Sequence, residues 1–170
     1  MKEIPLTRGK VALVDDIDYA VLSEYKWTAV KCGYEAGRTP SWYAVRTIRV
    51  DGRKIFIKMH HEVAKLAGLP TFPIYDHRDR NGLNNQRSNL RPSTKSQNGY
   101  NTVKKPGASS RFKWVSFNKR DGRWHVKLRS GGTVVQVGSF NDEIEAARAA
   151  NKAALTCHGE FAVLNNIPDL

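Results

Sequence analysis

The chain has few cysteines, few acidic residues and no long apolar run. Its two cysteines, Cys32 and Cys157, lie far apart and form no CxxC pair. Zinc sites and disulfide frameworks need more cysteines at closer spacing. We therefore expect no structural zinc and no disulfide, and a reducing, cytoplasmic setting.

Apolar residues never accumulate to the roughly 20 consecutive positions that a membrane-spanning helix needs. The first ten residues, MKEIPLTRGK, also lack the apolar core of a signal peptide. We expect no membrane partner.

Acidic residues are outnumbered by basic ones, 16 to 28, which gives a formal net charge of +12 at pH 7. Such an excess favours a polyanionic partner, most simply nucleic acid. Charge alone leaves open a basic protein whose charges are only solvated. The length, 170 residues, suits one mid-sized domain or two small ones.

The first 58 residues predict an antiparallel sheet. A hairpin over 4–14 is followed by a helix from Ile17 to Glu24, capped by Asp15 or Asp16. A strand begins at Trp27, a loop follows over 32–40, and residues 42–50 alternate as a strand does. Asp51-Gly52 then predicts a tight turn into a strand over 54–59. This hairpin is basic, and both a DNA contact and a solvated face remain open.

The stretch from Ile74 to Asn98, IYDHRDRNGLNNQRSNLRPSTKSQN, is the most informative part of the chain. Its pattern predicts a strand, a long polar loop, a short strand and a helix. Asp76 and Asn98 supply oxygen ligands of the kind that Mg²⁺ or Mn²⁺ takes. His77 follows Asp76, so on a strand it points to the opposite face and is suited to accept a proton from water. An isolated Asp-His pair in an Asn-rich loop also occurs without function.

These residues resemble an HNH nuclease core, the ββα-metal motif of phage and intron-encoded homing endonucleases. The match consists of Asp-His at a strand end, Asn-Leu-Arg thirteen residues later, and a helical Asn twenty-two residues after the Asp. The resemblance implies that Asp76 and Asn98 bind one divalent cation, that His77 is the general base, and that Asn89 orients His77. Asn98 stands where many HNH proteins have His. His60 and His61 precede a predicted helix over 62–67, and we expect a structural or substrate-side role for His60.

From Arg111 the pattern changes to three short strands, over 111–118, 123–129 and 133–137, and one helix. The middle strand alternates sharply, with Trp124, Val126 and Leu128 on one face and cations on the other. We expect Asn141 to cap the helix and Gly159 to end it. An alanine-rich helix face lets the helix lie close on the sheet.

This half resembles the Apetala-type, or ethylene-response-factor-like, DNA-binding domain. The match rests on the segments RFKWV, GRW, VGSF, EAARA and GEFAVLN. Trp114 stands in place of a glycine of that family, and Ser116 and Gln136 also depart from it. Together, the resemblance and the cationic sheet face predict these DNA-binding residues: Lys113, Ser116, Asn118, His125, Lys127, Arg129 and Gln136.

The sequence thus predicts an α+β protein in two parts. Residues 1–103 form an N-terminal antiparallel β region with a ββα-metal nuclease core at about 59–103. Residues 104–110 form a linker, and residues 111–166 a three-stranded antiparallel sheet packed on one helix.

The predicted function is metal-dependent, site-directed cleavage of double-stranded DNA by a homing-type HNH endonuclease in a bacterial or phage-infected cell. One centre per chain is consistent with nicking, and a dimer with cutting both strands. The alternative is a sequence-specific DNA-binding protein with an inactive HNH half. An RNA-directed protein is a further alternative that aromatic residues on the polar sheet face would favour.

Overall fold

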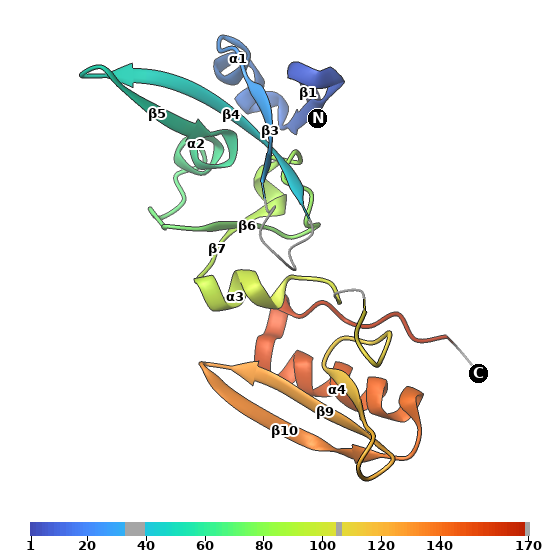
Figure 1. Cartoon of the computed structure of the whole chain (residues 1–170). Coiled ribbons are helices and arrows are strands. Elements are labelled where there is room, and N and C mark those ends of the chain that lie inside the picture. Colours follow the sequence, from blue (N-terminus) through green and yellow to red (C-terminus); the bar gives the residue numbers. More distant parts are fainter. Residues whose placement is uncertain (33–39, 105–106, 169–170) are drawn as a thin grey trace. The chain divides into compact units, whose positions relative to one another are not determined.

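The computed structural model describes residues 1–32, 40–104 and 107–168, and its chain contacts divide into two units, Met1–Thr94 and Lys95–Leu170. The predicted loop over 32–40 falls mostly outside the described residues, as do residues 105 and 106 of the predicted linker. The fold is α+β, with several small antiparallel sheets (Figure 1).

The first unit is built from short strands and helices around one apolar core. In order they are β1 Lys2–Pro5, the 3-10 turn η1 Thr7–Gly9, β2 Val11–Val14, α1 Asp16–Ser23, β3 Thr28–Cys32, β4 Ser41–Val50, β5 Arg53–Lys58, α2 Met59–Leu66, β6 Tyr75–His77, η2 Arg87–Asn89 and β7 Leu90–Pro92. β1 pairs with β2, β3–β4–β5 form one sheet, and β6 pairs with β7, all antiparallel. Met59, Val63 and Trp27 are among the core residues that join these pieces.

The second unit is a three-stranded sheet with a long helix along one face (Figure 1). Its elements are α3 Lys95–Tyr100, β8 Val115–Asn118, β9 Arg123–Ser130, β10 Thr133–Phe140, α4 Glu143–His158 and η3 Gly159–Phe161. Ala146, Ala147 and Ala150 are fully buried against Phe112, Val115 and Val126, because alanine lets the helix backbone come close to the sheet.

Several predicted boundaries were wrong for identifiable physical reasons. The first strand of the second unit begins at Val115 and not at Arg111, because Trp114 has a left-handed φ of 66° that interrupts extended backbone. Asp142, not Asn141, caps α4, and its carboxylate accepts a hydrogen bond from the Glu145 N–H at 2.9 Å. Asp15 occupies the N-cap position of α1, as predicted, but its side chain makes no capping hydrogen bond, because its carboxylate accepts from the backbone N–H of Arg87 instead.

The alternation predicted for the middle strand of the second unit is confirmed. Val126 and Leu128 are buried, whereas Lys127 and Arg129 are exposed. Gly159 ends α4 with a left-handed φ of 52°, as expected. The predicted order of strand, loop, strand and helix over 74–98 is also observed, as β6, β7 and α3. Of these, α3 is grouped by its contacts with the second unit.

Candidate active site on the β6–β7 hairpin

The candidate site begins with two neighbouring residues of β6 that are both buried. Asp76 pairs with Arg91 and His77 with Leu90 in the antiparallel register. Neighbouring strand residues point to opposite faces, yet Asp76 is 4% exposed and His77 5%. Each side chain therefore has its own buried surroundings.

The long loop between β6 and β7 is fastened to the N-terminal hairpin. The Leu13 N–H donates to the Leu83 carbonyl and the Asn85 N–H to the Leu13 carbonyl, both at 2.8 Å. The Arg87 guanidinium binds the carboxylate of buried Asp18 through Nε at 2.8 Å and Nη2 at 2.6 Å. Contacts between residues about 70 positions apart thus fix the loop beside His77.

Gly82 lets the loop come close to β4. A Cβ atom at this position would lie 2.5 Å from the Trp42 carbonyl oxygen and 2.6 Å from the Tyr43 ring. The absence of a side chain is therefore a requirement of space, since no left-handed φ is involved. The ring of Tyr43 in turn lies against His77, with ring centroids 5.9 Å apart.

Asn85 holds the imidazole of His77. The Asn85 Nδ2 donates to the Leu83 carbonyl at 3.1 Å, so its Oδ1 faces Nε2 of His77, at 3.5 Å. An amide oxygen only accepts hydrogen bonds, so this contact favours a neutral ring with its hydrogen on Nε2. In that tautomer the lone pair is on Nδ1.

Burial keeps the histidines near this site neutral. It lowers the pKa of His77 below the ordinary 6.5, against the opposing influence of the Asn85 hydrogen bond and of Asp79 and Asp76. Burial, followed by the nearby His77 and His61, lowers the pKa of His60 to about 2. His60 packs edge-on against His77, with centroids 5.0 Å apart. A neutral imidazole is the form that acts as a base.

Asn89, predicted to orient His77, makes hydrogen bonds to a neighbouring part of the loop. Its Nδ2 donates to Asp79 Oδ1 at 2.9 Å, and its Oδ1 accepts from the Asp79 N–H at 3.0 Å. Burial alone would raise the pKa of Asp79, but hydrogen bonds from the Asn81 N–H, Asn84 and Asn89 hold that pKa below its usual value. Asn89 therefore stabilises the loop, and the side-chain amide that contacts the His77 imidazole is that of Asn85.

Asp76, a predicted metal ligand, forms a buried ion pair with Arg91. Its Oδ2 accepts from Nε of Arg91 at 2.9 Å and from Nη2 at 2.7 Å. The other predicted ligand, Asn98, is an exposed residue of α3. Carboxylate and amide oxygens suit a hard divalent cation, so the donor chemistry of these two residues fits Mg²⁺ or Mn²⁺. Within residues 1–32, 40–104 and 107–168, no cluster of three or more His, Cys, Asp or Glu side chains could hold a metal.

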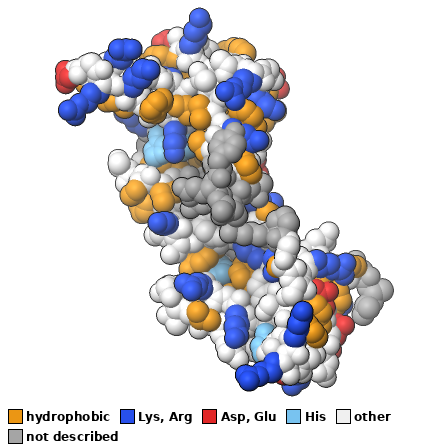
Figure 2. Space-filling view, in the orientation of Figure 1, with side chains coloured by type: hydrophobic (Ala, Val, Ile, Leu, Met, Phe, Trp, Pro, Cys, Tyr) orange, Lys and Arg blue, Asp and Glu red, His pale blue; other side chains and the backbone are white. Residues whose placement is uncertain are grey.

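The residues predicted to bind DNA fall into two groups. Three are engaged within the protein: Lys113 donates to the Tyr100 carbonyl at 2.6 Å, and Asn118 and His125 contact Asp121 at 3.1 and 2.7 Å. The exposed members are Ser116, Lys127, Arg129 and Gln136. Figure 2 shows many Lys and Arg side chains and few Asp and Glu on the visible surface.

Sequence reasoning missed Asn85, Arg91 and Gly82. Their roles depend on a strand register for Arg91, on a contact with β2 for Asn85 and on close approach to β4 for Gly82, none of which local patterns reveal. The turn residues of the loop were visible in the sequence, but which of several Asn side chains reaches His77 was not. A hairpin register with Asp and Arg directly opposite is the signal that would have identified Arg91.

Comparison with known proteins gives one informative match. A protein of Acanthamoeba polyphaga mimivirus, named as an uncharacterised HNH endonuclease, is 27% identical over 164 residues, which cover 94% of this chain and 77% of that protein. The similarity therefore extends through both units. No family model and no solved structure matches the chain.

Among the described residues, no helix is long and apolar enough to cross a membrane.

Proposed function

We propose that the chain is a metal-dependent HNH-type DNA endonuclease with its catalytic centre on the β6–β7 hairpin. The observation that carries the proposal is His77, buried next to Asp76 and held through Nε2 by Asn85. The similarity to a protein named as an HNH endonuclease supports the same class. The net charge of +12 supports DNA as the substrate.

In the proposed reaction, water attacks a phosphodiester phosphorus and the bond to the 3′ oxygen breaks. Nδ1 of His77 takes the proton of the attacking water, and solvent protonates the leaving oxygen, which gives a 5′-phosphate and a 3′-hydroxyl. Tyr43 and His60 pack against the imidazole and limit its rotation. Asn85 keeps the lone pair on Nδ1.

Asp76 would hold one Mg²⁺ or Mn²⁺ ion, with Asn98 as the second ligand that the resemblance to HNH nucleases implies. When bound, the ion stabilises negative charge on the phosphate and the leaving oxygen. Arg91 balances the carboxylate charge of Asp76 and keeps that side chain in place within the hairpin. The second unit would add DNA affinity by tethering. One centre per chain favours nicking of one strand.

A second candidate function is DNA binding without cleavage, and one observation favours it. The two hydrogen bonds from Arg91 to Oδ2 of Asp76 compete with a cation for that carboxylate. If the ion pair persists on DNA, Asp76 does not bind metal and the hairpin is only structural.

The test is conversion of supercoiled plasmid by the purified chain with Mg²⁺, Mn²⁺ or excess EDTA. The proposal predicts metal-dependent open-circle DNA with 5′-phosphate ends, and none with His77→Ala. Ser88→Ala, which removes an exposed hydroxyl from the same hairpin, should cleave as the wild type does. Tight, salt-sensitive binding without cleavage under any metal would favour the second candidate.

A further inference from the structure

The polar face of the second unit's sheet is partly covered, although its sequence predicts an open face. The segment that ends α3 is fastened there by Lys113, whose ammonium donates to the carbonyls of Tyr100 and Thr102. The Gly131 N–H donates to the Tyr100 hydroxyl at 3.2 Å, and the Tyr100 ring stacks on His158 at 3.8 Å. The face is therefore bounded on one side by α3.

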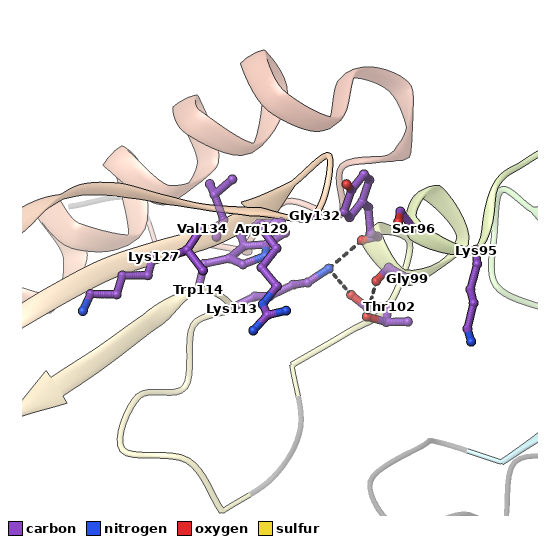
Figure 3. Close-up of a pocket in the computed structure, with 12 residues that line it drawn as sticks. Lys95, Ser96, Gly99, Thr102, Lys113, Trp114, Lys127, Arg129, Gly132 and Val134 are labelled. Carbon is purple, nitrogen blue, oxygen red and sulfur yellow. Dashed lines mark hydrogen bonds between the residues drawn. The ribbon is translucent and has the colours of Figure 1, made fainter.

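Between α3 and the sheet lies a groove of about 620 Å³, which we call the α3–sheet groove (Figure 3). Its walls include Tyr100, Trp114, Lys127, Leu128, Arg129 and Val134. The volume is within the range of sites that enclose small ligands, about 300–1,000 Å³. A hollow of this size admits a short piece of one nucleic-acid strand, whereas a double helix is too wide to enter it.

The charges of the groove suit a phosphodiester chain. No acidic side chain is among its described lining residues. Lys127 and Arg129 are two positions apart on β9, so they share a face and are separated by roughly 7 Å along the strand. Figure 3 shows the Arg129 side chain extending from β9 beside Lys113, whereas the Lys127 side chain extends along the sheet away from α3.

The apolar part of the groove is exposed. Val134 lies directly opposite Arg129 in the β9–β10 register and is 53% exposed. The faces of Trp114 are less accessible, because the Lys113 ammonium lies 4.3 Å from its ring centroid and His158 packs at 5.5 Å. A base would therefore contact Val134 and ring edges beside the two cations.

We propose that the α3–sheet groove binds a single strand of DNA, with phosphates on Lys127 and Arg129 and a base against Val134. The choice of DNA rests on the proposed function, since a nicked duplex exposes such a strand. The groove thus deepens that function by adding a site for single-stranded DNA separate from the hairpin that carries His77.

The test is fluorescence anisotropy of a labelled oligothymidylate with the full chain in EDTA, where no cleavage interferes. Lys127→Ala/Arg129→Ala should weaken binding at least tenfold. Loss of two phosphate contacts should also make the association constant depend less steeply on salt concentration: the slope of its logarithm against the logarithm of salt concentration should become shallower by about 1.4. The matched control is Lys119→Ala/Arg120→Ala, which removes two exposed cations from the turn after β8 and should change affinity less than twofold.

A second variant tests whether the single strand binds in the groove or is only attracted by nearby cationic side chains. Val134→Glu places a carboxylate in the groove at an exposed position, and should weaken single-strand binding tenfold without changing the circular dichroism spectrum. Equal weakening by the control pair, or no weakening by Val134→Glu, would overturn the proposal. Tighter binding of the matching RNA, or equal sensitivity of duplex DNA to the groove variants, would also overturn it. Failure of the nuclease proposal would appear separately, as absent cleavage with single-strand binding intact.

Discussion

The two units bury different kinds of side chain. Among the described residues, the first unit buries eight polar or charged side chains, six of them between Asp76 and Ser93, whereas the second buries three, Asn101, Ser110 and His158. The second unit is held mainly by alanines of α4 against the sheet. Burying polar groups costs stability unless each is hydrogen-bonded. This concentration of buried polar side chains in one hairpin coincides with the candidate site.

The largest expected effect comes from breaking the buried ion pair. Arg91→Met leaves the Asp76 carboxylate buried without its guanidinium, which should lower the free energy of unfolding by about 3–5 kcal/mol. Asp76→Leu/Arg91→Met removes both charges and should recover most of that loss. Urea unfolding followed by fluorescence measures both. A double variant as unstable as the single one would show that the pair's charge balance is not what stabilises the hairpin.

Crowding at Gly82 should give the next largest effect. In Gly82→Ala the new methyl group meets the Trp42 carbonyl and the Tyr43 ring, so the backbone must move, at a cost of about 1–3 kcal/mol. Gly99→Ala is the matched control in the second unit, because its Cβ would meet nothing within 4 Å. Within α3 it should stabilise slightly, by up to about 1 kcal/mol. If both substitutions change the thermal unfolding midpoint by equal, small amounts, the close approach of Gly82 to β4 does not matter for stability.

Acid should destabilise the first unit through His60. The folded state holds the pKa of His60 at about 2, below its ordinary 6.5, so the unfolded chain binds the proton and the folded one does not. Stability from this group is complete above pH 6.5 and is lost as pH falls below it, by about 1.4 kcal/mol per pH unit at most. His60→Phe keeps an aromatic ring and should flatten the decline between pH 6.5 and 4.5. If the stability of His60→Phe declines with acid as steeply as that of the wild type, groups other than His60 cause the decline.

The smallest effect concerns the cap of α4 in the second unit. Asp142→Ala removes the acceptor of the Glu145 N–H and should cost about 1 kcal/mol. Asn141→Ala, at the position that the sequence predicts as the cap, should change the free energy of unfolding by less than about 0.5 kcal/mol. The reverse result would contradict the observed cap.

Local patterns predicted what depends on neighbours in sequence. The turn residues and alternation between Ile74 and Asn98 gave the order of β6, β7 and α3, and the alternation in β9 gave its buried and exposed faces. The positions of Asp76 and His77 on a strand also followed from local signals, whereas the burial of that strand did not. These features need no knowledge of distant contacts.

The rest depends on contacts that sequence spacing does not encode. Asn85 reaches His77 because Leu13, on another hairpin, fixes its backbone. Arg91 faces Asp76 because of a register across a twelve-residue connection. Trp114 ends the extended backbone before β8 by its left-handed φ, which a tryptophan seldom adopts, so propensity alone favoured a longer strand.

The central claim is that His77 acts in chemistry and not in docking or folding. The most direct measurement is the single-turnover rate of cleavage of DNA already bound to the protein, for wild type, His77→Ala and Ser88→Ala. A general base predicts a rate about a hundredfold to ten-thousandfold lower for His77→Ala, with DNA affinity unchanged at a temperature where the variant is fully folded, and no change for Ser88→Ala. A His77→Ala variant that cleaves at the wild-type rate, or whose loss follows its loss of binding or folding, would contradict the claim.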